Sequence, residues 1–549
     1  MLEGHSPPNL APDSPLSYTR SRKWLALCDQ QHKGCQTTDS DWMPKRVIEI
    51  FEDSRHGSRG FLCRLATPNQ VSPYVALSYC WGGDQLAKTT KANLPAYRQN
   101  MDPTTLPQTL QDAIKVTHGI GLTYLWIDAM CIVQDDEIDK EEQISQMYQV
   151  YRNAYVTISV SINDKSTQGF LQPRSQYRGF ILPARLDDNV FGEVLAVPER
   201  LSAPTGKVSP DDSYPIFKRG WTYQEHKLSR RLLIYGHLGL VYWCQQATYR
   251  DGGHEPPNGR IQSLYALSLL RRANLPSPDE PASDSKHPAA WGEVIEAYAK
   301  RDLTVEEDRL PAVSAVAEGY ARTQPVTRYL AGLWREEFLE QCLWDVWDAE
   351  KTRRPATYLA PSWSWAAVVG DIRAVQWSPG EDGELVPPEF TASLVDAKVA
   401  VKSQTVPYGA VTGGSVRLRA KMRRAVWLNH EQSHRGDRTG GRAPDISDDE
   451  LSLLSMLGGD DPRVSLNVDV AEEWMGQTEV NMWTAEICQY PSEPLTKMSG
   501  EGLLLVEVSG SASPIFRRVG RLSVRNQEMM REKSWFNERE SSWQEVTVI

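Results

Sequence analysis

A carboxylate interrupts the apolar face of a predicted helix in the segment "KRGWTYQEHKLSRRLLIY". If the helix starts at Trp221, then Trp221, Glu225 and Leu228 fall at positions i, i+4 and i+7 on one face. A buried carboxylate costs free energy unless it has a partner or a chemical task. From spacing alone, an ion pair between Glu225 and Arg219 or another cation is favoured over a catalytic role, and both interpretations stay open.

Polar and small residues follow three strand-like runs, at the point where each run ends. In an open parallel sheet, ligands bind in the crevice beyond the carboxyl ends of the strands. Because those ends share one edge of the sheet, we expect the three groups to lie together. They are Ser78, Tyr79, Trp81, Gly82 and Gly83 after the first run, Asp128, Cys131 and Gln134 after the second, and Ser159 and Ser161 at the end of the third.

Each of these residues also has a purely structural interpretation. Asp128 is as well suited to capping the helix that follows it as to binding a ligand. Ser78 and Tyr79 are ordinary hydroxyls for the end of a strand. Trp81, Trp126 and Trp221 are expected in the core more than against a ligand, because large aromatic side chains dominate core packing.

Cysteine and histidine offer a different chemistry. A nucleophilic Cys131 would need a histidine within hydrogen-bond reach, such as His118 or His226, but no local motif supports one, so a buried thiol is favoured. The segment "CDQQHKGC" supplies three potential metal ligands at spacings unlike paired zinc knuckles. We interpret it first as a helix-packing motif, and a metal site is a distant second interpretation. The chain also lacks the glycine-rich loops that cradle phosphates.

Alternating strand and helix patterns position these side chains. Near-continuous apolar strands separated by amphipathic helices predict a parallel sheet with helices on its faces, hence an α/β fold. One predicted helix begins near Leu106 and stops at Gly119 or Gly121, and another covers residues 139–154. β-branched runs after residue 371 predict a β-rich C-terminal region.

The same patterns divide the chain into regions. Segments rich in proline, glycine, serine and charge, without apolar periodicity, are expected to be linkers or loops. We predict a disordered N-terminus at 1–18, a helix and β-hairpin packed on the core at 19–73, the strand-helix domain at 74–235, a mainly helical extension at 236–370, and the β-rich region at 371–549 with a disordered loop near 429–462.

Composition excludes several functional classes. A net charge of −11 argues against nucleic-acid binding, which depends on neutralising phosphates with Lys and Arg. No apolar run reaches the roughly 18 residues that span a bilayer. Eight cysteines in 549 residues do not make a disulfide framework, so a reducing, cytoplasmic location is expected.

Four segments together resemble, in order and spacing, the heterokaryon incompatibility (HET) domain of filamentous fungi. They are "YVALSYCWGG", "LPQTLQDAIKVTHGIGLTYLWIDAMCIVQDD", "EEQISQMYQVYRNAYVTISVS" and "RGWTYQEHKLSRRLLIY", all within residues 74–235. The resemblance implies a role in non-self recognition, a fungal form of innate immunity, and in regulated cell death.

HET domains are in turn similar to Toll/interleukin-receptor (TIR) domains, which have a flavodoxin-like parallel sheet. TIR domains that consume NAD carry a catalytic glutamate on a helix after the third or fourth strand, and in many members a tryptophan precedes it by four residues. Trp221 and Glu225 match that spacing, so the resemblance favours the catalytic interpretation of Glu225. The insertion at about 162–215 departs from the TIR pattern.

The resemblance thus implies an NAD glycohydrolase with Glu225 as the catalytic carboxylate. NAD is then a substrate, and no cofactor or metal is expected. TIR-type active sites are often completed by a neighbouring subunit, so self-association or other protein partners are expected. The substrate-binding residues would be Ser78, Tyr79, Trp81, Gly82, Asp128, Cys131, Gln134, Arg219 and Trp221.

A second function from a different class is a non-catalytic signalling module. In that case the strand-end residues form a packed core, and signalling depends on protein contacts. Glu225 facing an open crevice within reach of Asp128 and Ser78 would favour the enzyme, whereas Glu225 sealed in an ion pair with Arg219 would favour the module. A hydrolase that uses the Cys131 thiol is the third and least supported alternative.

Overall fold

The computed structural model divides into two compact units, Met1–Ser277 and Pro278–Ile549. The first eight residues of the predicted disordered N-terminus and all of the predicted disordered loop at 429–462 lie outside the described residues. The structure describes residues 9–35, 41–53, 60–85, 87–174, 180–187, 190–196, 214–237, 239–251, 289–323, 327–375, 388–428, 464–470, 479–492, 497–508, 514–528 and 541–549.

The first unit is built on an eight-stranded sheet with the strand order β10-β9-β8-β5-β3-β4-β1-β2. Its strands are β1 (Val47–Asp53), β2 (Gly60–Ala66), β3 (Tyr74–Ser78), β4 (Tyr124–Trp126), β5 (Val156–Val160), β8 (Arg231–Gly236), β9 (Gly239–Cys244) and β10 (Thr248–Arg250), and a separate hairpin joins β6 (Phe180–Asp187) to β7 (Val190–Ala196).

The four central strands of this sheet, β8, β5, β3 and β4, are parallel, and antiparallel pairs extend both sides. Every residue of β3, β5 and β8 is buried, because helices cover both faces. Counted along the chain, the parallel strands lie in the order 4-3-1-2. This is the order of the first four strands of a flavodoxin-like doubly wound sheet.

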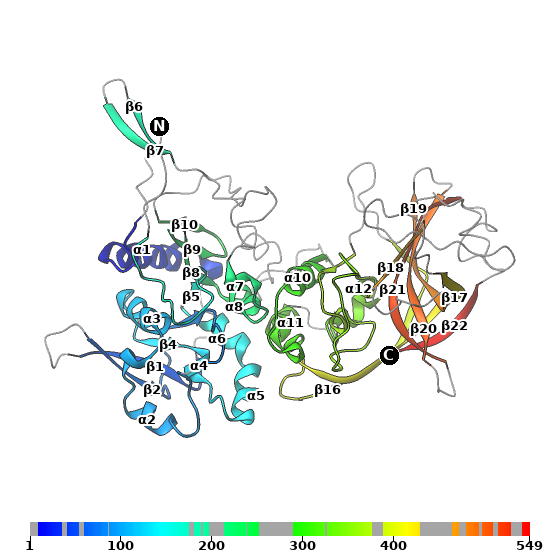
Figure 1. Ribbon diagram of the computed structural model, residues 1–549, viewed down its shortest axis with the longest axis horizontal. Coiled ribbons are helices and arrows are strands. Elements are labelled where there is room, and N and C mark those ends of the chain that lie inside the picture. The colour runs from blue at the N-terminus through cyan, green and yellow to red at the C-terminus, as the bar shows by residue number, and fades with distance from the viewer. Residues whose placement is uncertain are drawn as a thin grey trace. The chain divides into compact units, whose positions relative to one another are not determined.

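Helices cover the two faces of the sheet (Figure 1). α1 (Pro15–Gln31) contacts α3 (Gln108–Gly119), which packs on β4, while α6 (Met147–Asn153) contacts α8 (Thr222–Leu228), which packs on β3. The shorter helices of this unit are α2 (Leu94–Gln99), α4 (Asp128–Cys131), α5 (Glu137–Ser145) and α7 (Pro215–Lys218).

Two segments differ in detail from the sequence analysis. The single helix expected at 139–154 is two helices, α5 and α6, because Gln146 (φ −100°, ψ 2°) leaves the helical conformation. α5 buries only two polar side chains, whereas α6 buries four large ones, so the two segments need different orientations. Residues 239–250, within the extension expected to be mainly helical, form strands β9 and β10 of the sheet.

The second unit begins with helices and ends in a mainly antiparallel sheet. Its elements are α10 (Ala289–Ala299), α11 (Pro311–Thr323), α12 (Phe338–Gln341), the short strands β11 (Tyr329–Leu330), β12 (Leu333–Trp334), β13 (Asp345–Val346) and β14 (Ile372–Arg373), and the eight-stranded sheet of β15 (Glu389–Phe390), β16 (Ser393–Val401), β17 (Val411–Leu428), β18 (Val464–Val468), β19 (Glu479–Ser492), β20 (Lys497–Glu507), β21 (Ile515–Glu528) and β22 (Ser542–Val548). In this sheet β21 and β22 pair in parallel. The two units together confirm the predicted fold class.

Tryptophans organise the core of the second unit. Trp291 and Trp365 both donate from their indole nitrogens to the carbonyl of Gly332, each at 2.9 Å. Gly332 has φ +102°, and a Cβ there would lie 2.7 Å from the Trp365 indole nitrogen. Glycine is therefore required where the backbone passes this aromatic cluster.

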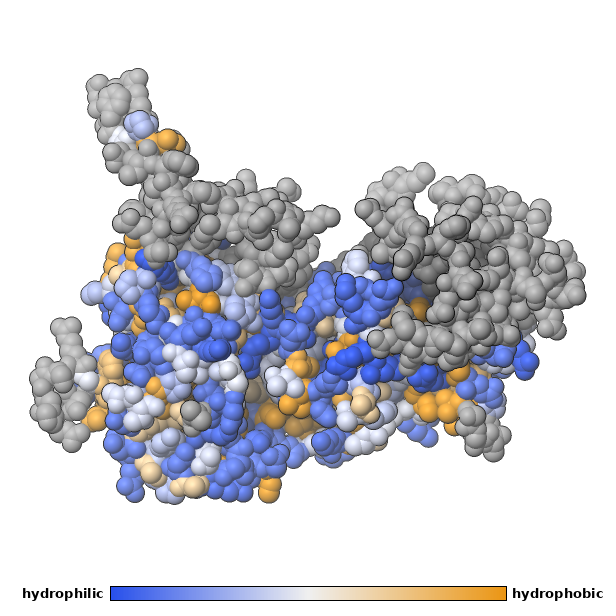
Figure 2. Space-filling view, in the orientation of Figure 1, coloured by the Kyte–Doolittle hydropathy of each residue, from blue (hydrophilic) through white to orange (hydrophobic). Residues whose placement is uncertain are grey.

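Hydrophilic residues cover most of the described surface on the face drawn in Figure 2, and apolar residues occur in small groups. Among the described residues, none of the helices combines the length and the apolar character needed to cross a membrane. All eight cysteines are free and buried.

Candidate functional site at the carboxyl edge of the parallel sheet

The candidate site lies where the parallel strand order reverses. β3 is the first parallel strand in the chain, and its neighbours are β4 on one side and β5 on the other. The crossovers that follow β3 and β5 therefore leave in opposite directions, and in doubly wound sheets ligands bind at such a point. Ser78 at the end of β3 pairs in register with Ser159 of β5 at this point.

A buried histidine joins these two strand ends. The Nε2 atom of His226 lies 3.2 Å from the Ser78 hydroxyl and 3.0 Å from the Ser159 hydroxyl. Ser159 also lies within 3.3 Å of the Ser161 hydroxyl. The sequence analysis considered His226 only as a base for Cys131, although its position directly after Glu225 was a usable signal.

The direction of α8 explains why its first turn reaches this edge. Ser229, just after the helix, donates to the Thr157 hydroxyl (2.7 Å) near the start of β5. The helix thus runs from the carboxyl edge of the sheet back to the amino edge, so Glu225 and His226 lie nearer the strand ends. All seven residues of α8 are buried, which means that tertiary packing holds this short helix.

Glu225 is a buried carboxyl group with incomplete hydrogen bonding. It is 6% exposed, and its Oε2 atom has no hydrogen-bond partner among the described residues. Burial raises its pKa to about 7, and the nearby charge of Asp128 acts in the same direction. The hydroxyls of Ser78 and Tyr151 and the charge of Arg219 oppose that increase in pKa.

The ion pair between Glu225 and Arg219 that spacing favoured does not form within the described part of the chain. Arg219 is close enough to lower the pKa of Glu225, but the two side chains make no direct salt bridge there. Arg219 also lowers the pKa of Asp128. Its cation therefore acts on both carboxyl groups through space.

Asp128 is held at the end of β4 by two hydrogen bonds. The indole nitrogen of Trp81 donates to its Oδ2 atom (2.9 Å), and the Ala129 amide donates to Oδ1 (2.7 Å). Burial raises its pKa nonetheless, although the Tyr79 hydroxyl opposes the rise. Asp128 thus bonds an amide in the first turn of α4, and its charge also acts on Glu225.

The two glycines after β3 have different surroundings. Both have positive φ angles, +77° at Gly82 and +121° at Gly83. A Cβ at Gly82 would lie 2.6 Å from the Lys165 Cα atom, whereas nothing lies within 4 Å of the corresponding position at Gly83. Gly82 thus permits the chain near Lys165 to pack against the strand end, and the space at Gly83 is open.

Three other predicted residues lie near the edge without joining the cluster around His226. Cys131 is fully buried, and burial raises its pKa to about 12, so its thiol is poorly suited to act as a nucleophile. The Gln134 side chain donates to the carbonyls of Asp128 (3.1 Å) and Ile132 (3.3 Å). Trp221 is the half-buried N-cap residue of α8.

The arrangement combines two carboxyl groups with raised pKa values, several hydroxyls and one imidazole. Such a set can accept hydrogen bonds from ligand hydroxyls, and an ionised Glu225 can stabilise a positive charge. The described side chains grouped closely enough to hold a metal ion are elsewhere, at Cys28, His32, Cys35 and Cys244.

Comparison with known proteins gives one match. The model of the family described as Heterokaryon incompatibility protein (HET) matches residues 74–225. These residues contain β3 to β7 and end at Glu225, so the match includes Ser78, Asp128, Ser159 and Glu225 and stops one residue before His226. No curated protein and no solved structure matches the chain.

Proposed function

We propose, from the premise that residues 74–225 of this chain form a HET domain, that the protein promotes regulated cell death by cleaving NAD. The domain itself supports a role related to heterokaryon incompatibility. The finer proposal is an NAD glycohydrolase whose catalytic carboxylate is Glu225. It also rests on the likeness of HET domains to TIR domains.

One observation carries this proposal: the buried, incompletely bonded carboxyl group of Glu225 at the edge where doubly wound sheets bind ligands. A carboxyl group that served packing alone would be expected to have a cation or a full set of hydrogen-bond donors. A pKa of about 7 also lets this group change charge near neutral pH. Strongly perturbed carboxyl groups of this kind concentrate at functional sites.

The reaction needs only one carboxylate of this kind. The bond between the ribose C1′ atom and the nicotinamide nitrogen breaks, and its electron pair stays on nicotinamide, which leaves as a neutral molecule. No general acid is needed for that step. An ionised Glu225 stabilises the developing oxocarbenium charge, and water then adds to C1′ and loses a proton, which yields ADP-ribose and nicotinamide.

The neighbouring residues supply binding in this proposal. In this proposal Ser78 and Asp128 would bond ribose hydroxyls, and the half-exposed Trp81 would stack on a base. The open space at Gly83 leaves room for the dinucleotide to approach the backbone. Tyr79, Gln134, Arg219 and Trp221 complete the proposed surroundings of the substrate.

A second candidate function is the non-catalytic signalling module. The observation that favours it is burial, because Ser78, Ser159 and His226 are each at most 1% exposed. In this alternative the hydroxyl and imidazole contacts hold α8 on the sheet, and the domain signals by binding protein partners.

The deciding experiment is NAD turnover by the purified full chain, with and without a clustering agent. Release of nicotinamide by the wild type, and a loss of at least about 100-fold in Glu225→Gln, would support the glycohydrolase. Activity should rise as the pH increases through about 7, because the carboxylate is the active form.

Glu137→Gln is the matched control, since Glu137 is an exposed carboxylate of the same domain that pairs with Lys140 on its own helix. Its turnover should equal that of the wild type. Absence of turnover by the wild type under every clustering condition would reject the glycohydrolase in favour of the signalling module.

A further inference from the structure

Four potential metal ligands meet at the amino edge of the sheet, away from the candidate functional site. Cys28 lies in the last turn of α1, His32 caps that helix, and Cys35 ends the short 3-10 helix that follows. Cys244, the last residue of β9, completes the group. The Sγ and imidazole nitrogen atoms of these residues all lie within 4.8 Å of one another.

The register of the strands shows at which edge of the sheet these four ligands lie. Cys244 pairs with Arg231, the first residue of the parallel strand β8. The amino end of β8 is at the opposite edge from Ser78 and Ser159, which lie at carboxyl ends. The cluster is therefore separate from the site around Glu225.

We propose that Cys28, His32, Cys35 and Cys244 form a structural zinc site. Three thiolates and one imidazole are an established ligand set for tetrahedral zinc, and structural zinc sites use all four positions for protein ligands. Thiolate and imidazole ligands in a tetrahedral arrangement select zinc over the harder cations calcium and magnesium.

The distances fit that geometry. Zinc bonds of about 2.3 Å to sulfur and about 2.0 Å to nitrogen place tetrahedral ligand atoms roughly 3.5 to 3.8 Å apart. The Cys244 Sγ atom already lies 3.3 Å from the His32 Nδ1 atom. The other ligand atoms, all within 4.8 Å of one another, need to move by at most about an ångström.

Packing alone explains the cluster less well. Buried free cysteines often act as small apolar side chains, which is how the sequence analysis interpreted "CDQQHKGC". That interpretation does not account for an imidazole nitrogen directed at a sulfur, nor for a thiol from residue 244 placed beside two from residues 28 and 35. Convergence of four ligand atoms from two distant parts of the chain is expected of a metal site.

Polar groups surround the four ligands. The Ala247 amide donates to the Cys244 sulfur (3.2 Å). Arg231 donates to the Cys35 carbonyl (3.2 Å), pairs with Asp29 (2.6 Å) and lies over the Tyr155 ring. Three thiolates, a neutral imidazole and Zn²⁺ sum to a charge of −1, and this buried arginine, which the site shares with Asp29, lies beside that charge.

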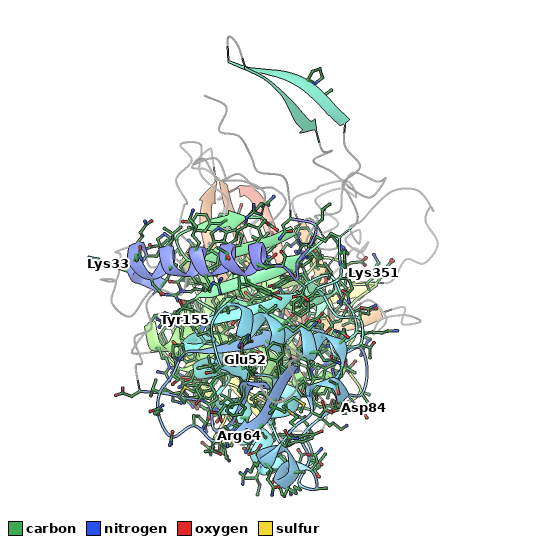
Figure 3. All side chains as sticks on the ribbon, turned by 90° about the vertical axis from the view of Figure 1, so that its left-hand side faces the viewer. Lys33, Glu52, Arg64, Asp84, Tyr155 and Lys351 are labelled. Atoms are coloured by element: carbon green, nitrogen blue, oxygen red, sulfur yellow. The ribbon has the colours of Figure 1, made fainter. Side chains whose placement is uncertain are left out.

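Zinc would fasten α1 to the edge of the sheet. Figure 3 shows Lys33 at the C-terminal end of α1 and Tyr155 below that helix, and the Tyr155 hydroxyl donates to Asp29 at 2.7 Å. α1 already contacts β9. On binding, Zn²⁺ gains three Zn–S bonds and one Zn–N bond, and three thiol protons are released to solvent.

The test is metal content of the reduced, full-length protein, measured by inductively coupled plasma mass spectrometry. We expect one zinc per chain in the wild type and in Cys63→Ser, where Cys63 is a buried thiol of β2 outside the cluster. Cys244→Ser should bind Zn²⁺ at least about tenfold more weakly in competition with a chelator. Equal affinity of Cys244→Ser and wild type would overturn the proposal.

A second measurement needs no variant. After zinc removal, Co²⁺ added to the reduced wild type should give the visible spectrum of a tetrahedral ion with thiolate charge-transfer bands. Failure of the reduced wild type to take up either Zn²⁺ or Co²⁺ would overturn the site, as would a Co²⁺ spectrum without thiolate bands or a disulfide within the cluster of the freshly purified protein.

Discussion

Glu225 in the first unit and Glu501 in the second are glutamates of similar burial with opposite surroundings. Glu225 is 6% exposed and Glu501 is 3% exposed. Glu501 accepts hydrogen bonds from Arg521 (3.0 Å), Ser523 (3.0 Å) and Tyr490 (3.2 Å). Glu225 has one oxygen without a partner among the described residues and no direct cation there.

The same contrast holds for the aspartates beside them. Asp345 accepts two hydrogen bonds from Arg373, at 2.6 and 2.7 Å, and one from Arg521 at 3.1 Å. Asp128 accepts hydrogen bonds from an indole and an amide, and its charged neighbours include Arg219 and Glu225, the second of which shares its sign. Glu501 and Asp345 of the second unit are thus neutralised by arginines, while Glu225 and Asp128 of the first unit lie near each other.

This difference separates two uses of a buried charge. A carboxylate with a full set of donors and a cation is fixed in one state, which suits a structural role. A carboxyl group with an unused oxygen and a raised pKa can exchange a proton or meet a positive charge brought by a ligand. Burial by itself does not distinguish the two, but the partners do.

The largest expected effect is a loss of stability when an ion pair of the second unit is broken. Arg521→Met leaves Glu501 buried without its cation and should lower the free energy of unfolding by about 4 kcal/mol. Urea unfolding of the full chain, followed by tryptophan fluorescence, measures this loss. Arg417→Met is the control, because Arg417 and Glu545 are half-exposed and 4.0 Å apart, so it should cost less than about 1 kcal/mol. Equal losses in the two variants would contradict the structural role of the network.

A second, smaller effect on stability is a gain and not a loss. The pKa of Glu225 rises from 4.5 in the unfolded chain to about 7 in the folded one. Between those values the unfolded chain releases the proton first, so stability is complete below about pH 4.5 and falls as the pH rises through about 7. The loss amounts to about 3 kcal/mol. Glu225→Gln should therefore stabilise the protein above pH 7 and change it little near pH 4.5.

Glu501→Gln is the matched comparison for that prediction. It removes the charge that Arg521 neutralises, so it should destabilise the protein at neutral pH. Urea midpoints measured from pH 5 to pH 8 compare the two variants with the wild type. A loss of stability in Glu225→Gln at pH 8 would mean that Glu225 is satisfied in the folded protein and that the contrast is wrong.

The smallest expected losses of stability come from removing one serine hydroxyl in each unit. Ser523→Ala removes a hydrogen bond to a carboxylate and should cost about 2 kcal/mol, because bonds to charged groups are the stronger ones. Ser159→Ala removes a bond to His226, which keeps Ser78 as a partner, and should cost about 1 kcal/mol. The same unfolding measurement ranks the two variants, and a reversed order would weaken the comparison.

Sequence patterns predicted the elements of the first unit well where the pattern is local. The apolar run at Tyr74–Ser78 is β3, and the helix expected after Leu106 is α3, which ends at Gly119. The patterns missed the break at Gln146, since a reorientation between two short helices depends on which side chains each one buries.

The sequence by itself determined the family resemblance, the parallel strands and the meeting of three strand ends at one edge, because periodicity and chain order are enough to define a doubly wound sheet. Only the tertiary structure decided that His226 bonds Ser78 and Ser159, that Glu225 makes no ion pair with Arg219 in the described part of the chain, and that Cys244 joins Cys28, His32 and Cys35. The physical reason is distance along the chain. Ser78 and His226 are 148 positions apart, and His32 and Cys244 are 212 apart, so strand register and helix direction bring them together and no local pattern records the contact.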